Sequence, residues 1–461
     1  MRIRLPTHPF VAAALAVLAL AGSAPAQAQV PRFLAALAPC TNGLTGNWRC
    51  ATVRVYLDRA KQRGHVDLGL AFLHSPGPAR PAIVGLAGGP GLPALSSAGF
   101  FANKMAPGLA THDLLVFDQR GTGVSDRLNC PEIESNSSWT AQQVRACAAQ
   151  LGPDRGLYSS RQTAADIEDV RRLLGIPVLT LFGISYGTKT ATDYARLYPS
   201  HVEALILDSV VSKDTDPFYR YSARSIVRIL RDECGAVKCG YDPAVDIQAL
   251  IRRQHHGYVG FADGSSVSEA QLLDLFMNNK RGLPQIPGLI HRALRGDPRG
   301  LVNDVSSYIP DLRAGTAGRQ SRTLYLATTC DDSVLPWSVH DLRARRLAET
   351  GAWLVGAGST FAPFTASLGW QYGVGSLCAP WPSAGGFPAL PALPDVPALL
   401  LEGADDALTP VEEAQSVAAE LPRAQLMVMA ATTHVVLEQD PQCINTAVAR
   451  FFSGVPVGAS C

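Results

Sequence analysis

A serine flanked by two glycines is the residue of this sequence best suited to covalent catalysis. Ser185 stands in the segment Gly183-Ile184-Ser185-Tyr186-Gly187, which has the pattern G-x-S-x-G. An apolar run precedes the segment and a helical pattern follows it, so we expect a sharp strand-to-helix turn that exposes the serine. The N-terminus of that helix favours the negative charge that develops during acyl transfer. The pattern therefore predicts that Ser185 is a nucleophile.

A glycine-rich segment, Gly88-Gly89-Pro90-Gly91, follows another apolar run. A serine nucleophile needs N–H donors aimed at the oxyanion that forms on the substrate carbonyl. Pro90 has no N–H to offer, so we expect the donors to be Gly89 and the residue after the nucleophile, Tyr186. A phosphate-binding loop is the alternative, and it is disfavoured because no Lys-Ser or Lys-Thr pair follows these glycines.

The serine also needs a histidine base and a carboxylate that orients it. Among the ten histidines, His434 fits best, because it follows a strand-like run near the C-terminus. Upstream of it, another apolar run leads into two adjacent aspartates. We expect Asp406 rather than Asp405 to be the acid, because Asp406 stands three residues before Thr409-Pro410, where a helix restarts. Asp208, which follows an earlier strand, is a remote alternative whose simpler role is a turn or cap.

The elements that would position these residues are short apolar strands that alternate with helices. This alternation predicts an α/β fold with a mostly parallel, doubly wound sheet. Helical patterns cover residues 163–174 and the segment after Gly187. The expected strands are Thr52–Leu57, Val66–Leu73, Ala82–Leu86, Asp113–Phe117, Val178–Phe182, Val202–Leu207, Ala398–Leu401 and Gln425–Met429.

The alternation stops in the middle of the chain, where helical patterns are broken by Gly and Pro. We expect residues 29–211 and 391–461 to form the two parts of an α/β-hydrolase core, and residues 212–390 to be an inserted, mainly helical cap. The N-terminus has two arginines, an apolar run and then Ala26-Gln27-Ala28. This layout predicts a signal peptide over residues 1–28 and export to the periplasm or the medium, since the apolar run is too short to span a bilayer.

An even number of cysteines in an exported chain favours disulfides over free thiols. The sequence does not fix their connectivity, but pairing in sequence order is the simplest arrangement because it closes five short loops. Zinc binding is the alternative, and it is disfavoured because no second close pair of Cys or His accompanies Cys234 and Cys239. The ten cysteines are Cys40, Cys50, Cys130, Cys147, Cys234, Cys239, Cys330, Cys378, Cys443 and Cys461.

Composition narrows the function further. The 461 residues carry a formal net charge of +1 and no long run of like charge, which argues against a nucleic-acid partner. Hydrophobic residues make up 47% of the chain, enough to bury a large core. Nothing in the sequence calls for a metal or an organic cofactor, and no segment beyond the signal peptide suggests stable membrane insertion.

The order of these motifs resembles that of secreted bacterial tripeptidyl aminopeptidases and their proline iminopeptidase relatives. The shared set is Gly88-Gly89-Pro90-Gly91, Asp118-Gln119-Arg120-Gly121, the segment around Ser185, Asp406 with Thr409-Pro410, and His434 followed by Cys443. Two positions depart from the family pattern, with Ala87 in place of His and Thr433 in place of Gly. Neither change removes a member of the expected triad.

The resemblance implies a serine peptidase that releases short units from free peptide N-termini through an acyl-enzyme. It assigns Ser185, Asp406 and His434 to the triad, and it implies that Arg120 pairs with carboxylates in a structural loop. An aminopeptidase needs acidic groups for the substrate ammonium, and Asp331 and Asp332 are candidates, although a simple turn beside Cys330 explains them equally well. A carboxylesterase or lipase with the same triad is the alternative, and a non-catalytic envelope binding protein is a remote one.

Overall fold

The structure is a computed structural model that describes residues 37–41, 43–75, 79–135, 138–213, 216–278, 283–307, 320–338, 340–381 and 389–460. The expected signal peptide and Cys461 lie outside these residues. In the described part of the chain, no helix is long and apolar enough to cross a bilayer.

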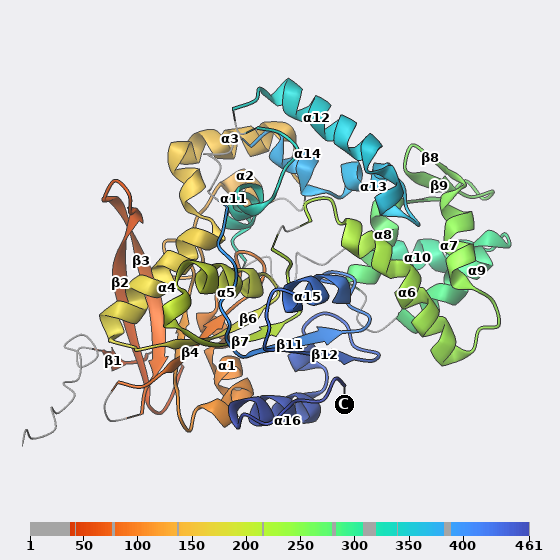
Figure 1. The fold of residues 1–461 in the computed structure, drawn as a ribbon. Helices are drawn as coiled ribbons and strands as arrows, with labels where there is room; N and C mark the ends of the chain where they lie inside the picture. Colours follow the sequence, from red (N-terminus) through yellow and green to blue (C-terminus); the bar gives the residue numbers. More distant parts are fainter. Residues whose placement is uncertain are drawn as a thin grey trace, which may run out of the picture.

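A nine-stranded sheet forms the centre of the molecule (Figure 1). Its strand order is β1-β2-β3-β5-β4-β6-β7-β11-β12. The pairs from β5 onward are parallel, whereas β1, β2 and β3 form an antiparallel edge. The strands are β1 (Ala38–Pro39), β2 (Trp48–Asp58), β3 (Arg63–Leu73), β4 (Ala82–Leu86), β5 (Asp113–Phe117), β6 (Leu179–Ile184), β7 (Val202–Asp208), β11 (Ala398–Gly403) and β12 (Ala424–Met429).

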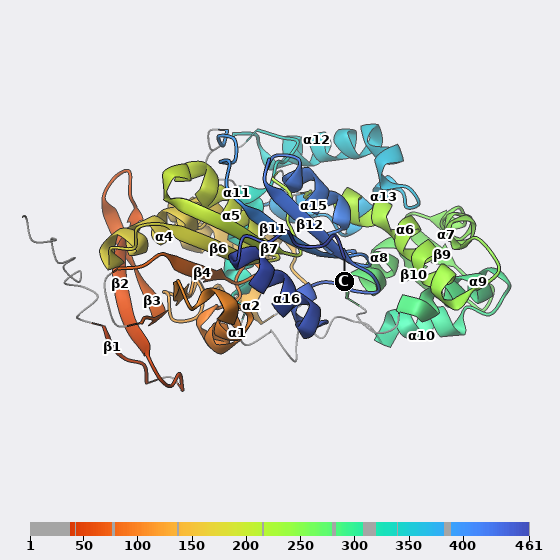
Figure 2. The same ribbon diagram turned by 60° about the horizontal axis from the view of Figure 1, so that its bottom comes forward.

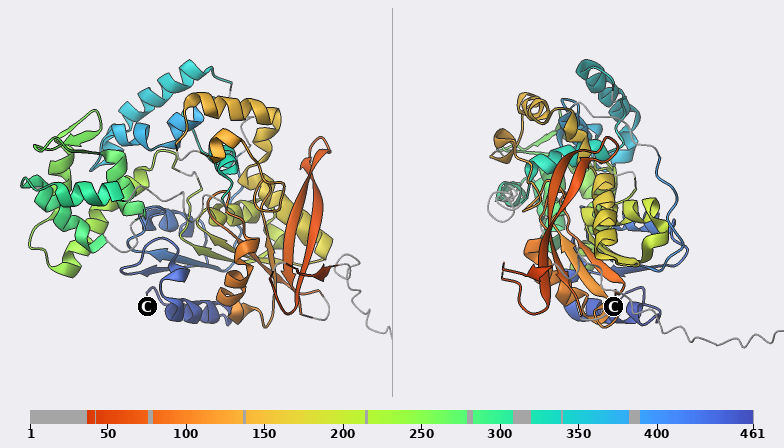
Figure 3. Two further views of the ribbon diagram at one scale, coloured as in Figure 1. Left: turned by 180° about the vertical axis from the view of Figure 1, so that it is seen from behind. Right: turned by 90° about the vertical axis from the view of Figure 1, so that its left-hand side faces the viewer.

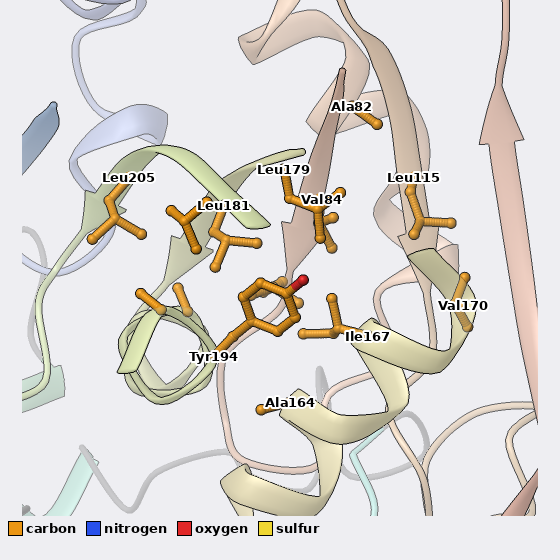
Figure 4. Packing of buried hydrophobic residues seen from close by; sticks show 14 of the residues in the cluster. Ala82, Val84, Leu115, Ala164, Ile167, Val170, Leu179, Leu181, Tyr194 and Leu205 are labelled. Carbon is orange, nitrogen blue, oxygen red and sulfur yellow. The ribbon is translucent and has the colours of Figure 1, made fainter. Parts of the chain in front are cut away.

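Helices cover both faces of this sheet, which is why its central strands are mostly apolar rather than alternating. On one face, α4 (Ser160–Leu174), α5 (Tyr186–Leu197) and α15 (Val411–Ala418) pack against the sheet. Figure 4 shows Ile167 and Tyr194 of these helices against Val84 and Leu181 of the strands. On the other face lie α1 (Ala98–Lys104) and α16 (Pro441–Phe452), visible below the sheet in Figure 2.

These observations confirm the predicted α/β fold with a mostly parallel sheet. Each of the eight predicted strands corresponds to a strand of the sheet, with bounds that differ by a few residues. The short strand β1 was not predicted, because two exposed residues have no periodicity to detect. Between β5 and α4 the chain also forms α2 (Pro131–Glu134), α3 (Ala141–Leu151) and the 3₁₀ helix η4 (Gly152–Leu157).

The segment between β7 and β11 contributes no strand to the large sheet in the described residues. Its helices α6 to α10 gather at the end of the molecule opposite β2 and β3 (Figures 1 and 3) and bury a hydrophobic cluster of their own. The segment also holds a small antiparallel sheet that the helical patterns did not reveal. Its elements are α6 (Arg220–Val237), α7 (Pro243–Ile251), β8 (Gln254–His255), β9 (Tyr258–Gly260), β10 (Ser266–Ser268), α8 (Glu269–Asn278), α9 (Ile286–Leu294), α10 (Arg299–Ser307), α11 (Arg322–Asp332), α12 (Arg343–Gly356), α13 (Ala366–Gln371) and α14 (Val374–Cys378).

Four disulfides connect cysteines that are consecutive in the sequence. They are Cys40–Cys50, Cys130–Cys147, Cys234–Cys239 and Cys330–Cys378. The last of these joins α11 to α14 within the segment between β7 and β11. The fifth pair expected from the sequence involves Cys461, which lies outside the described residues, so that pair stays a prediction.

Candidate active site

Ser185 lies on the tight turn between β6 and α5. Its backbone has φ 54° and ψ −125°, a conformation that is unusual for a residue with a side chain. The glycines on either side make the turn possible. A Cβ on Gly183 would lie 2.5 Å from the carbonyl oxygen of Gly187, and a Cβ on Gly187 would collide with the carbonyl oxygen of Leu86. The sequence pattern therefore marks a turn that needs glycine at both positions.

The structure brings His434 to this serine from the loop after β12. The imidazole Nε2 lies 3.0 Å from Ser185 Oγ, although the two residues are 249 positions apart in the sequence. On the other side of the ring, Nδ1 lies 2.7 Å from Asp406 Oδ2. This is the geometry in which a histidine can take the serine proton while a carboxylate fixes its tautomer.

Asp406 is fully buried in the turn after β11, where it accepts several hydrogen bonds. The N–H groups of Leu408 and Thr409 donate to Oδ1 at 2.8 and 2.9 Å, and the Thr409 hydroxyl donates to Oδ2 at 2.9 Å. Burial raises the pKa of Asp406, but the charge of His434 and these hydrogen bonds outweigh it and hold the pKa below its ordinary value. The carboxylate is therefore ionised at neutral pH.

The neighbouring Asp405 points away from the histidine. It lies near Asp232 and Arg228 of α6, and burial together with the Asp232 charge raises its pKa to about 6. Of the two adjacent aspartates, the structure brings Asp406 and not Asp405 to His434.

Two backbone N–H groups are available beside the serine. Tyr186 is the first residue of α5, so its N–H has no acceptor within the helix. Gly89 lines the same cavity as Ser185, and in the described part of the chain neither N–H donates to another group. A Cβ on the preceding Gly88 would lie 3.0 Å from the Cβ of Ser185, so this glycine-rich loop lies directly against the nucleophile turn.

The cavity beside Ser185 has a volume of about 130 Å³ and contains three carboxylates. Among the described residues that line it, none is a lysine, arginine or histidine. The lining residues are Gly89, Pro90, Ser185, Tyr186, Val211, Asp216, Pro217, Tyr219, Ser222, Tyr325, Thr329, Asp332, Ser333, Leu408, Thr409 and Glu413.

Asp332, one of the two predicted binding residues, reaches the cavity from the end of α11. It accepts hydrogen bonds from the Tyr186 hydroxyl at 2.8 Å and from the backbone N–H of Ser160 at 3.1 Å. Burial raises the pKa of Asp332, and the charge of Lys189 opposes that rise. The other predicted residue, Asp331, is not among the residues that line the cavity, and its charge acts on Arg155.

Glu413 and Asp216 are the two carboxylates of the cavity that the sequence did not single out. Glu413 lies in the first turn of α15 and accepts the N–H of Ser212 at 2.7 Å, while burial raises its pKa to about 7. Asp216 lies just before α6, accepts the N–H groups of Phe218 and Tyr221, and pairs with Arg220 Nε at 3.1 Å. Acidic residues are common in and just before the first turn of a helix, so their positions alone did not indicate a binding role.

Arg120 lies outside this cavity and supports its own loop, Asp118-Gln119-Arg120-Gly121. Its Nε and Nη2 atoms donate to the two carboxylate oxygens of Asp166, each at 2.7 Å. Both side chains are completely buried. This confirms the expected structural pairing. In the described residues no group of three or more His, Cys, Asp or Glu side chains could hold a metal ion.

Two family profiles match the chain. Residues 81–242 match the profile described as alpha/beta hydrolase fold, and residues 362–459 match the one described as TAP-like protein. The first range contains Gly89 and Ser185, and the second contains Asp406 and His434.

Named proteins with similar sequences include peptidases. The chain is 24% identical over 413 residues to a tripeptidyl aminopeptidase of Streptomyces lividans, an alignment covering 79% of this chain and 74% of the relative. It is 25% identical over 497 residues to the serine protease Hip1 of Mycobacterium tuberculosis, covering 91% of this chain and 88% of the relative. A shorter match, 29% over 128 residues, covers 28% of this chain and 32% of a proline iminopeptidase of Neisseria gonorrhoeae.

Proposed function

Because the chain belongs to the α/β-hydrolase superfamily, matches a TAP-like profile and is similar to a tripeptidyl aminopeptidase, we propose that it is an exported serine aminopeptidase. In this proposal Ser185 attacks the carbonyl carbon of a peptide bond near a free N-terminus. His434 accepts the serine proton and Asp406 stabilises the imidazolium. The N–H groups of Gly89 and Tyr186 bind the oxyanion.

Collapse of the first tetrahedral intermediate breaks the peptide bond. His434 returns its proton to the leaving amine, and the released N-terminal unit remains esterified to Ser185. Water then attacks this acyl-enzyme, with His434 as the base again, and frees Ser185 and the carboxylic acid product. The distances of 3.0 Å from His434 to Ser185 and 2.7 Å from His434 to Asp406 support these roles.

The observation that carries the choice of an aminopeptidase is the acidic cavity. Asp216, Asp332 and Glu413 line the same space as Ser185, and no cationic side chain joins them among the described lining residues. Arg220 already pairs with Asp216, at 3.1 Å from Nε to Oδ1, and the charge of Lys189 acts on Asp332, whereas no cation of the described residues opposes the rise in the pKa of Glu413. A carboxylate in a confined space is costly unless a cation compensates it. The ammonium group of a free peptide N-terminus supplies that cation, whereas an ester substrate without an amine does not.

We also propose that residues 212–390 act as a cap whose α6 and α11 complete this cavity. Asp216 precedes α6 and Asp332 ends α11, so two of the three carboxylates come from that segment. The proposed export rests on the N-terminal signal pattern, and the four disulfides support it because such bonds persist in oxidising compartments.

The test compares substrates with and without a free amine. Aminoacyl-, dipeptidyl- and tripeptidyl-arylamides are assayed in free and N-acetylated forms, together with short-chain p-nitrophenyl esters. We expect turnover of the free arylamides, a large loss on acetylation, and no turnover of any substrate by the Ser185→Ala variant. Equal turnover of free and acetylated substrates would contradict the aminopeptidase and leave the carboxylesterase alternative.

A further inference from the structure

The last residue of β7, Asp208, holds the loop that follows His434. Its carboxylate is completely buried, and its two oxygens accept different backbone N–H groups. Val436 donates to Oδ1 at 3.0 Å and Leu437 donates to Oδ2 at 3.1 Å. These two residues begin the short 3₁₀ helix η8 (Val436–Glu438), where N–H groups have no acceptor within the helix.

The next residue, Ser209, holds the same loop one position closer to the histidine. Its hydroxyl oxygen accepts the N–H of Val435 at 2.8 Å, and the hydroxyl donates to Asp208 Oδ1 at 3.0 Å. The N–H groups of Val435, Val436 and Leu437 therefore all donate to this pair of residues. We call Asp208 and Ser209 the clamp.

The clamp holds a backbone that would not adopt its conformation unaided. Val435, directly after His434, has φ +65°, a value that is rare for a β-branched residue. Such a conformation is costly and persists only where the surrounding structure imposes it. Three consecutive hydrogen bonds to the clamp provide that constraint.

The backbone of the clamp connects it to the two other parts of the proposed triad. The carbonyl oxygen of Asp208 accepts the N–H of Ser185 at 2.8 Å. The N–H of Ser209 donates at 2.9 Å to the carbonyl of Leu401 in β11, the strand that leads to Asp406. One dipeptide thus contacts the nucleophile, the strand before the acid and the loop after the base.

We propose that Asp208 and Ser209 are positioning residues that fix the His434 imidazole against Ser185. This inference rests on the triad of the proposed function and assigns neither residue a contact with substrate. Burial raises the pKa of Asp208 to about 6, although the hydrogen bonds from Leu437 and Val436 oppose this rise. Because this value still lies below 7, the carboxylate is ionised at neutral pH.

The sharpest test is Ser209→Gly. Ser209 itself has φ +58°, which glycine adopts without strain, so the change keeps the backbone and removes the hydroxyl that holds Val435. We expect kcat for a free aminoacyl-arylamide to fall about tenfold or more with KM within about twofold, since small misplacements of catalytic groups have effects of this size. The unfolding midpoint should fall only slightly, because relief of the left-handed backbone at position 209 offsets part of the lost hydrogen bond.

Asp208→Asn is the second variant, because its amide group can accept only one of the two N–H groups. We expect kcat and the rate of fluorophosphonate labelling of Ser185 to fall together, by about 100-fold.

Asp113→Asn is the matched control. Asp113 is also buried and accepts bonds from His74 and the Ser75 N–H, but it lies at the opposite end of the strands. The control should keep its labelling rate.

A measurement independent of turnover separates this inference from the proposed function. The far-downfield proton resonance of the His434–Asp406 hydrogen bond should be sharp in the wild-type protein and in Asp113→Asn, and broadened or shifted in Ser209→Gly. Wild-type kcat, labelling rate and resonance in Ser209→Gly would overturn the clamp. The resonance could be present in the wild-type protein and lost in Ser209→Gly while the fluorophosphonate never labels Ser185. That result would support the clamp and contradict the proposed function.

Discussion

The hydroxyl of Tyr186 donates a 2.8 Å hydrogen bond to the carboxylate of Asp332. Tyr186 follows Ser185 directly, and Asp332 is the last residue of α11. A side chain from the segment between β7 and β11 is therefore tied to the residue whose N–H we assign to the oxyanion. In the proposed function, this contact links the residue that binds the substrate ammonium to the residue that binds the oxyanion.

Two substitutions of Asp332 should separate these roles. Asp332→Asn keeps an oxygen for the Tyr186 hydroxyl but removes the charge, so kcat/KM should fall about 10- to 100-fold for free arylamides, the size of a lost hydrogen bond to a charged group. Acetylated ester substrates should change little. Asp332→Ala also removes the acceptor for Tyr186, so it should slow both substrate classes. An Asp332→Asn variant that slows both classes equally would argue against ammonium binding by this carboxylate.

Glu413 should make recognition of a free amine depend on pH. Burial raises its pKa to about 7, so the carboxylate gains the charge that attracts an ammonium as the pH rises through 7. The ratio of kcat/KM for free and acetylated substrates should therefore rise between pH 6 and pH 7.5, below the ordinary pKa of about 7.7–8.0 at which a peptide amine loses its proton. Any effect of pH on the chemical step itself is common to both substrates and cancels in the ratio. In Glu413→Gln the ratio should be low and flat over this range.

The adjacent aspartates should respond very differently to the same substitution. Asp406→Asn should lower kcat by roughly 10³- to 10⁴-fold, the cost of leaving the histidine in the wrong tautomer. Asp405→Asn should keep kcat within about threefold of the wild-type value, because it removes no group bonded to His434 and its effect on the barrier stays below about 1 kcal/mol. Steady-state kinetics with one free arylamide checks both variants, and a reversed order would exchange the roles assigned here.

Asp405 should instead affect stability. Its pKa is about 6 in the folded protein and about 4 when unfolded, so the folded state holds the proton more tightly and loses stability as the pH rises from 4 to 6. Its Oδ1 is buried without a hydrogen-bond partner in the described residues. Asp405→Asn removes this penalty and should raise the free energy of unfolding by about 1–2 kcal/mol at pH 7.5 and by almost nothing at pH 4. Urea unfolding of both proteins at the two pH values checks this, and equal gains at both would contradict it.

The sequence was informative wherever one local constraint determined the structure. The central strands are buried on both faces, so their apolar runs located them almost residue by residue. The turn at Ser185 needs Gly183 and Gly187, which made it recognisable. The choice of Asp406 over Asp405 agreed with the geometry, because its distance from Thr409-Pro410 reflects the turn that Thr409 closes around it.

The cavity could not be derived in the same way. Glu413 and Asp216 stand at the starts of helices, where a carboxylate is ordinary, and only the packing of α6 against α15 gives them a shared space with Ser185. Asp331 and Asp332 were equivalent in the sequence, yet the end of α11 turns only Asp332 toward Tyr186. The contacts of the clamp could not be predicted from the sequence for a related reason. Asp208 and the loop of His434 come together only because β7 and β12 flank β11 in the sheet.

Because Ser185 and His434 are 249 positions apart, the proposed site can form only late in the folding of the chain. The elbow carrying the serine can form early, from neighbouring parts of the sequence, but β11 and β12 must dock beside β7 before an acid and a base reach it. Contacts between such distant residues form slowly, because a long loop must first close. If Ser185 acts as proposed, a partly folded molecule has an unactivated serine, and acylation of that serine reports that folding is complete.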